Sequence, residues 1–239
     1  MSLQSQHAIH ALAALEAYRA GRARRPQRDF VPAPDVLGAL EARFYAALRD
    51  VRPTGKRTLM ALDVSGSMEI GQVAGIPGLT PRLVTAAMAL VASATEKQHG
   101  FVAFTRAPLG PGGRFGGGRS SLTPLSIPRD ARLETVVRQL GRMPFGGVDC
   151  ALPMRWALEQ KLEVDLFVVY TDVEAWVGED SPAAALDEYR AETGIPAKLA
   201  VVGLLGRRFR IADPADPGML DIVGFDLGTP TRLARFALA

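Results

Sequence analysis

The chain has 239 residues, of which 48% are hydrophobic and 22% are charged, and this balance suits one large domain or one domain with an appendage. It has no apolar run of the roughly 18 residues that a membrane span needs, and no basic N-terminal stretch leading into an apolar core, so the sequence predicts neither a span nor a signal peptide. The single cysteine, Cys150, excludes an internal disulfide, and we interpret it as a small buried filler in a cytoplasmic protein.

The net charge of +3 is unevenly distributed along the chain. Residues 1–57 carry ten Lys/Arg and five Asp/Glu, whereas residues 58–239 carry eighteen and twenty. Five arginines crowd into the segment 19–28: Arg19, Arg22, Arg24, Arg25 and Arg28. Such a run is most often a solvated face, but it can also contact phosphates, so it is a candidate patch for binding nucleic acid.

The first 55 residues predict two helices and no strand. Residues 7–20 have apolar side chains at near-helical spacing, and a linker containing Gly, Arg and Pro follows over 21–34. A second helix is expected over 35–51, with Asp35 as its cap. Two helices bury little surface by themselves, so they must pack on another part of the protein. We therefore predict a helical segment over 1–55 and a separate domain over 56–239.

From residue 57 onward, short apolar strands alternate with helices. Thr80 and Pro81 mark one helix start, Ser181 and Pro182 mark another, and Gly194 marks an end. The expected strands cover residues 57–63, 100–105, 164–172 and 197–204, and the expected helices cover 82–97, 132–142, 150–161, 182–193 and 234–239. This alternation predicts an α/β fold with a doubly wound, mostly parallel sheet covered by helices on both faces.

Two of the expected strands end on an aspartate, at Asp63 and at Asp172. Ligands of such sheets bind outside the carboxyl ends of the strands, so neighbouring strands would bring both carboxylates to one edge. Ser65 and Ser67 stand in the turn that leaves Asp63. Hydroxyl and carboxylate oxygens are the ligands of a hard divalent cation, and Mg²⁺ needs only a few of them. Asp63, Ser65, Ser67 and Asp172 are therefore the candidate metal ligands.

The same residues carry a family resemblance. Residues 63–67, DVSGS, resemble the D-x-S-x-S element of the metal-ion-dependent adhesion site of von Willebrand factor A domains, and Asp172 in "YTD" matches the later aspartate of that site. The segments "PFGGVDCALPM", "VVYTDVEAW" and "IADPADPGMLDIVGFD" are similar to the C-terminal part of the Ro ribonucleoprotein, or TROVE, family. One position departs from the family, because Val148 stands where the family has a threonine that contributes to the metal site.

The resemblance implies a von Willebrand A domain that closes a ring of helical repeats, with the N-terminal helices as the end of that ring. It implies a non-catalytic protein that binds small non-coding RNA, both Y RNA and misfolded RNA, in RNA quality control. It also implies a divalent cation, most simply Mg²⁺, with water or Asp149 in place of the missing threonine. RNA binding by this part of such a protein should be weak and should depend on the arginines of residues 19–28, because phosphate neutralisation drives RNA binding and residues 58–239 are net negative.

Other functions fit the residues less well. A phosphatase of the haloacid dehalogenase type needs a second acid two residues after the first, where this chain has Ser65. The Gly-rich segment 109–121 lacks the G-K-[ST] of a phosphate-binding loop. A protein-interaction module, whose metal takes a carboxylate from a partner protein, remains the main alternative to a role in RNA binding.

Overall fold

The computed structural model describes residues 4–21, 30–73, 76, 78–106, 120–172, 181–206 and 209–239. Within them, one six-stranded sheet has the order β3-β2-β1-β4-β5-β6. Its strands are β1 (Thr58–Leu62), β2 (His99–Arg106), β3 (Ser120–Leu125), β4 (Leu166–Thr171), β5 (Lys198–Gly203) and β6 (Met219–Val223). All neighbours pair in parallel except β2 and β3, which are antiparallel. The predicted mostly parallel sheet is confirmed.

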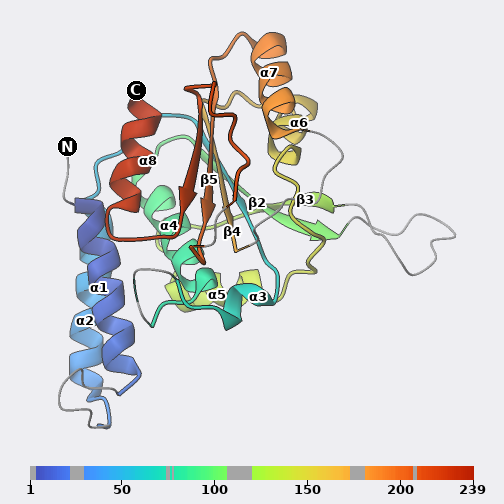
Figure 1. The fold of residues 1–239 in the computed structure, drawn as a ribbon. Coiled ribbons are helices and arrows are strands. Elements are labelled where there is room, and N and C mark those ends of the chain that lie inside the picture. Colours follow the sequence, from blue (N-terminus) through green and yellow to red (C-terminus); the bar gives the residue numbers. More distant parts are fainter. Residues whose placement is uncertain are drawn as a thin grey trace, which may run out of the picture.

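Helices cover both faces of the sheet, as Figure 1 shows. The helices are α1 (Gln4–Arg19), α2 (Pro34–Arg49), α3 (Ser67–Ile70), α4 (Pro81–Thr95), α5 (Leu133–Gly141), α6 (Leu152–Glu159), α7 (Pro182–Thr193) and α8 (Thr229–Leu238). Residues of α4, α5 and α8 share one apolar cluster with the sheet, and residues of α6 and α7 share the other. The doubly wound arrangement predicted from the alternation is therefore present, and none of these helices is long and apolar enough to cross a membrane.

The two apolar clusters follow from the alternation of side chains along each buried strand. In β1, Met60 and Leu62 belong to the cluster under α4, whereas Leu59 and Ala61 belong to the cluster under α6 and α7. Successive side chains of a strand point to opposite faces, so a strand covered on both sides must be apolar throughout. All five residues of β1 are buried accordingly.

The two N-terminal helices form a hairpin that packs on the domain. Helix α2 contacts α4 and helix α1 contacts α8, and Figure 1 shows the hairpin standing beside the sheet. Ile9, Leu12 and Phe44 are fully buried and belong to the same apolar cluster as the sheet residues under α4. The packing partner that two helices require is therefore the face of the domain formed by α4 and α8.

Local signals placed some helix ends correctly and misplaced others. Thr80 caps α4 by accepting a hydrogen bond from the Leu83 amide at 3.3 Å, and Gly194 ends α7 with a φ of 69°, where a residue with a Cβ would be strained. The prediction that Asp35 caps the second helix is wrong: Ala33 is the N-cap, and Asp35 lies in the first turn after Pro34. An acid in this turn still favours the helix, because it faces the positive end of the helix dipole.

Strands β3 and β6 and helix α3 were not predicted, and the last helix was predicted too short. Strands β3 and β6 lie at the two edges of the sheet, where the polar residues of SSLTPL and MLDIV are tolerated because one side of the strand has no partner. The short helix α3 directly follows residues 63–66, here called the site loop. Helix α8 begins at Thr229 rather than at residue 234, and Pro230 in its first turn was the missed start signal.

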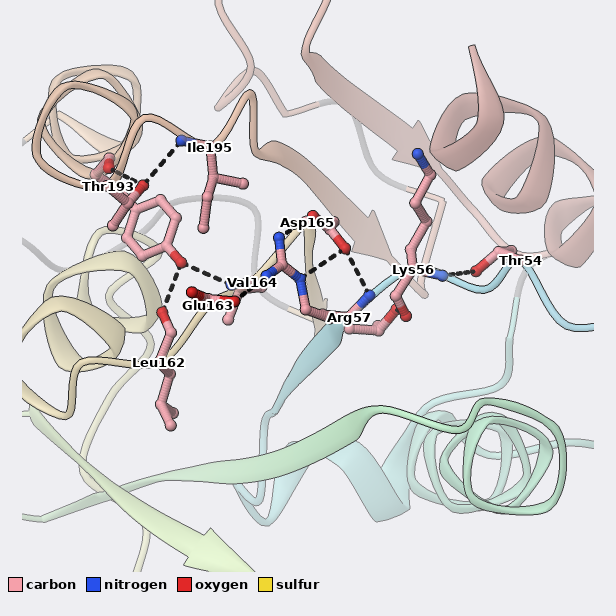
Figure 2. A network of polar contacts seen from close by, with 11 residues as sticks. Thr54, Lys56, Arg57, Leu162, Glu163, Val164, Asp165, Thr193 and Ile195 are labelled. Carbon is pink, nitrogen blue, oxygen red and sulfur yellow. Dashed lines mark hydrogen bonds and ion pairs between the residues drawn. The ribbon is translucent and has the colours of Figure 1, made fainter.

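The amino ends of β1 and β4 are joined by a charged network, which Figure 2 shows from close by. The Arg57 guanidinium donates to both carboxylate oxygens of Asp165, at 2.6 and 3.0 Å, and the Arg57 amide donates to the same carboxylate at 2.9 Å. Arg57 also pairs with Glu163. The Tyr189 hydroxyl accepts from the Val164 amide and donates to the Leu162 carbonyl, both at 2.7 Å. This edge of the sheet is closed by matched charges.

Candidate metal centre

The pairing of β1 with β4 brings the two candidate carboxylates to one edge of the sheet. Leu62 stands opposite Tyr170 in the parallel register, and the Asp63 amide donates to the Tyr170 carbonyl at 3.0 Å. Asp63 follows the last residue of β1, and Asp172 follows the last residue of β4. The prediction that these aspartates lie at the carboxyl ends of adjacent strands is confirmed.

Hydrogen bonds hold the Asp63 carboxylate in a fixed orientation. One oxygen accepts from the Ser65 amide at 2.8 Å, and the other accepts from the Thr171 hydroxyl at 2.9 Å. Asp63 is only 1% exposed. Thr171 was missed in the sequence, although it stands directly before Asp172 in a strand that was correctly predicted. These two hydrogen bonds fix the plane of the buried carboxylate and hence the directions of its remaining lone pairs.

The two serines bring their hydroxyls into direct contact. The distance between the Ser65 and Ser67 hydroxyl oxygens is 2.9 Å. Ser65 and Asp172 are buried, whereas Ser67 is exposed, so the group of oxygens reaches solvent on the Ser67 side. A bound ion could enter from this side without any rearrangement of the strands.

A buried arginine supports the loop that carries these serines. Arg82, in the first turn of α4, is 3% exposed, and its guanidinium donates to the Ser65 carbonyl at 2.7 Å. It also pairs with Glu69 of α3. The Ser65 main chain is therefore fixed twice, by its carbonyl on Arg82 and by its amide on Asp63. The sequence signal was a single charged residue inside a helix that is otherwise almost entirely apolar.

The position at which the sequence departs from the family, Val148, is buried. Val148 is 2% exposed and packs in the apolar cluster that also contains Cys150. Burial, together with the charges of Asp149, Asp221 and Asp63, raises the pKa of the Cys150 thiol. Cys150 is thus a buried filler, as predicted. The Asp149 carboxylate accepts from the Ala151 amide at 2.9 Å, so one of its oxygens already caps a turn.

The donor set at this edge fits a hard cation. It consists of two carboxylates and two hydroxyls, with neither thiolate nor imidazole. Across the described ranges, no group of three or more His, Cys, Asp and Glu side chains is placed to hold a metal, so a zinc site of the usual kind has no ligands there. Magnesium keeps several waters and requires few protein oxygens. Asp63, Ser65, Ser67 and Asp172 offer a sufficient number of them.

The predicted arginine patch is only partly within the described residues. Arg19 lies at the end of α1 and pairs with three acids: Glu16 at 2.7 Å, Glu134 at 3.2 Å and Glu41 at 3.8 Å. Arg22, Arg24, Arg25 and Arg28 lie outside the described residues. A charge that already has acidic partners is less available to a phosphate, so Arg19 is a weak candidate for RNA binding.

Comparison with known proteins identifies relatives that are similar over most of this chain. A family model described as the Ro60 vWA domain matches residues 57–237. RNA-binding protein RO60 of Deinococcus radiodurans is 45% identical over 209 residues, which are 87% of this chain and 36% of that protein. RNA-binding protein RO60 of Caenorhabditis elegans is 38% identical over 206 residues, which are 86% of this chain and 30% of that protein.

The structural comparison agrees with the sequence comparison. The crystal structure of the Deinococcus radiodurans RO (RSR) protein superposes with a TM-score of 0.86 and 42% sequence identity, over 97% of this chain and 44% of that one. The chain spans about a third of the length of the curated relatives that it matches. With a fold, a family model and relatives in agreement, the chain belongs to the Ro60 family and contains that family's von Willebrand A domain.

Proposed function

We propose that this chain is the cation-binding, non-catalytic part of a Ro-type protein that binds small non-coding RNA. In this proposal Asp63, Ser65, Ser67 and Asp172 hold one divalent cation, Mg²⁺ being the best fit. The RNAs of the whole protein are Y RNA and misfolded small RNA, and its role is in RNA quality control. The proposal for RNA draws on the relatives, which are named as RNA-binding proteins.

One observation carries the metal part of this proposal. The Ser65 and Ser67 hydroxyl oxygens lie 2.9 Å apart at the edge where two strand-end aspartates meet. When bound, the cation supplies a positive charge with an open coordination position for an anionic ligand. The protein's own residues hold that charge in place: Ser65 and Ser67 offer hydroxyl oxygens, and the two aspartates offset the charge directly or through water.

The arrangement of the centre argues against hydrolysis. Hydrogen bonds engage both oxygens of Asp63, so this carboxylate is a poor nucleophile. His99 begins β2, at the amino edge of the sheet, whereas Ser65 follows the carboxyl end of β1. His10 is exposed on α1. Neither of these histidines is placed to activate Ser65, so the centre is better suited to binding than to proton transfer.

Calorimetric titration with Mg²⁺ tests the metal part. The unaltered chain should give a binding isotherm with one site, and Asp63→Ala should give none, because the ion loses a carboxylate that compensates its charge. Asp187→Ala is the matched control: this acid on α7 is 72% exposed, so its loss should leave the isotherm unchanged. An isotherm that survives in Asp63→Ala would place the ion elsewhere, and a flat trace for the unaltered chain would mean that Val148 disables the site.

A second candidate function is binding of a protein partner through the same cation. Ile70, three residues after Ser67, is 86% exposed, so the opening of the site is flanked by an apolar side chain that a protein ligand could cover. A partner would then supply a carboxylate to the ion. Replacing Ile70 by Ser would weaken such a partner while leaving Mg²⁺ affinity intact, which separates this function from RNA binding.

A further inference from the structure

Arginines gather in two hollows beside α5, between the N-terminal hairpin and the candidate metal centre. The first hollow, of about 420 Å³, is lined by Arg138 and Arg142 of α5 together with Arg19, Glu69 and Glu134. Glu69 belongs to α3, which begins at Ser67, so this hollow adjoins the site loop. Figure 1 shows α5 beside α3 and on the side of the sheet that carries α4.

The acids of the first hollow already have cationic partners. Glu134 pairs with Arg19 at 3.2 Å, and Glu69 pairs with the buried guanidinium of Arg82. Arg138 and Arg142 are exposed, and within the described part of the chain neither makes an ion pair. The hollow therefore presents two guanidinium groups whose charges are not offset by an acid of the described residues.

The second hollow continues the positive surface toward α2. It has a volume of about 710 Å³ and is lined by Arg49, Arg129 and Arg132, with Asp130 as the acid among its lining residues. Arg132 lies over the ring of Tyr45, with its guanidinium carbon 5.1 Å from the ring centroid.

The start of α5, where Arg132 lines the second hollow and Leu133 lines the first, is held in place by the hairpin. The Tyr45 hydroxyl of α2 accepts a hydrogen bond from the Leu133 amide at 2.8 Å, and Leu133 is the first residue of α5. Leu133 itself is 1% exposed and belongs to the apolar cluster under α4. Arg132 and the start of α5 are thus anchored to both the hairpin and the domain, so the arginines stand on a fixed scaffold rather than on a free loop.

We propose that these five residues, Arg49, Arg129, Arg132, Arg138 and Arg142, form an arginine band that contacts the phosphates of single-stranded RNA. The inference rests on the RNA-binding part of the proposed function and deepens it by assigning a surface. Guanidinium groups match phosphate oxygens with paired hydrogen bonds, and several of them in a row follow a backbone rather than a single anion. A strand laid along the band would run from α2 toward the opening of the metal centre.

The band favours a single strand over a duplex because its arginines line two hollows, one along α5 and one between α2 and residues 129–132, rather than a flat face. A single-stranded backbone can bend into successive hollows, whereas an A-form duplex is stiff and offers phosphates along a fixed helical path. The plain alternative is a solvated basic face, since most charge clusters are no more than that. An RNA-binding band and a merely solvated face differ in one measurable quantity, the number of cations released from these arginines' phosphate contacts when RNA binds.

The experiment measures RNA binding of the whole chain by fluorescence anisotropy, with a labelled oligouridylate as the probe, over a series of salt concentrations. The band variant carries Arg129→Gln, Arg132→Gln, Arg138→Gln and Arg142→Gln. The matched control removes the same charge from exposed residues elsewhere and carries Lys97→Gln, Lys161→Gln, Arg210→Gln and Arg235→Gln. A third variant replaces Arg22, Arg24, Arg25 and Arg28 by Gln. Thermal unfolding of each protein checks that the substitutions leave the fold intact.

The band variant should bind at least about tenfold more weakly than the unaltered chain, and its slope of log K against log salt should fall by roughly 3 units, since each phosphate contact on a single strand contributes about 0.7. In the control variant, the affinity and the salt slope should each change by no more than about a third of the change expected for the band variant. Cross-linking of an oligomer that contains 4-thiouridine should map to α5 and to residues 129–132. A self-complementary RNA duplex should bind more weakly than the single strand.

The possible failures are distinguishable. RNA binding that survives in the band variant and is lost in the third variant would overturn the band and leave the RNA-binding function standing, with residues 22–28 as its surface. Equal weakening by the band variant and the control would reduce the effect to net charge and also overturn the band. No binding of any RNA by the unaltered chain at low salt would overturn both the band and the proposal that this part of the protein contacts RNA.

Discussion

The acidic side chains at the two ends of β1 and β4 have different partners. At the amino edge, the Arg57 guanidinium binds Asp165 through two nitrogens and also pairs with Glu163, so each acid meets a base (Figure 2). At the carboxyl edge, Asp63 is held by an amide and a hydroxyl, neutral donors that orient a carboxylate without cancelling its charge. The first edge joins the strands through an ion-paired network, whereas at the second edge neutral donors orient the Asp63 carboxylate, an arrangement that suits a cation site.

The largest expected difference between the edges is their response to Mg²⁺. If the carboxyl edge binds the ion, Mg²⁺ at a hundred times its dissociation constant should stabilise the folded chain by about 2.7 kcal/mol. Asp63→Ala should abolish this gain, whereas Asp165→Asn should lower stability and retain the gain. Thermal unfolding with and without Mg²⁺ measures both. Equal Mg²⁺ effects in the two variants would show that the ion does not distinguish the two edges.

Loss of the arginine under the site loop should have the next largest effect. Arg82→Met keeps much of the side-chain volume but leaves the Ser65 carbonyl without its 2.7 Å donor in a buried place, which should cost about 2–3 kcal/mol of unfolding free energy. Arg82→Lys should recover part of this loss. Chemical denaturation measures the stability, and Mg²⁺ calorimetry on the same proteins shows whether the loop must be held for the ion to bind.

A stability loss in Arg82→Met with unchanged Mg²⁺ affinity would contradict a role for Arg82 in positioning the serines. The matched control is Arg190→Met, since Arg190 is also held by acids, Asp187 and Asp216, but lies far along the chain in α7. That variant should lose stability without any change in Mg²⁺ binding.

The stability that the amino edge contributes should depend on pH. The Arg57 guanidinium, by hydrogen bonding, holds the pKa of Asp165 below its usual range. A carboxyl whose pKa is lowered by folding contributes stability above the pKa of the unfolded chain, near 3.9, and this stability is lost as the pH falls through the lower folded value. Asp165→Asn should therefore cost roughly 1–2 kcal/mol at neutral pH and progressively less below about pH 4.

Chemical denaturation at several pH values from neutral to strongly acidic measures this dependence. Asp187→Asn on α7 is the control, because that acid is 72% exposed and a surface pair of this kind contributes little. A cost for Asp165→Asn that stays the same at acid and neutral pH would mean that packing, rather than the ionised carboxylate, stabilises this edge.

The sequence predicted the part of the centre that depends on local pattern. Asp63 and Asp172 could be placed together because each ends an apolar run, and parallel strands end at the same edge. Arg82 could not be placed, because its contacts with the Ser65 carbonyl depend on how α4 packs against a loop 17 residues earlier in the chain. The proposed arginine band was not predicted for a different reason: four of its five residues lie within residues 58–239, whose net negative charge averages over surfaces that differ in sign.

The two edge strands, β3 and β6, could not be predicted from the sequence either. Strand β3 contains Pro124 and three hydroxyl residues, a composition that predicts a loop, and it forms a strand only because β2 offers an antiparallel edge. In β6, Asp221 interrupts the apolar pattern, and its carboxylate accepts from the Ile211 and Ala212 amides at 2.8 and 3.1 Å. The sequence does not show that Asp221 binds these amides, because this contact depends on the conformation of the loop that precedes β6.

The smallest expected effect concerns Val148 and refines the account of the carboxyl edge. Val148 stands where the family has a metal-site threonine, and the two side chains have nearly the same shape, so Val148→Thr should fit the buried position sterically but adds a buried hydroxyl. If the new hydroxyl reaches the ion, Mg²⁺ affinity should rise by up to about tenfold, equivalent to roughly 1.4 kcal/mol. Without Mg²⁺ the variant should be less stable than the unaltered chain, because a buried hydroxyl then lacks a partner. Val201→Thr, in the same apolar cluster on β5, is the control that carries this cost alone. Calorimetry that finds the same affinity for Val148→Thr and for the unaltered chain would mean that water already completes the shell of the ion and that the threonine is dispensable.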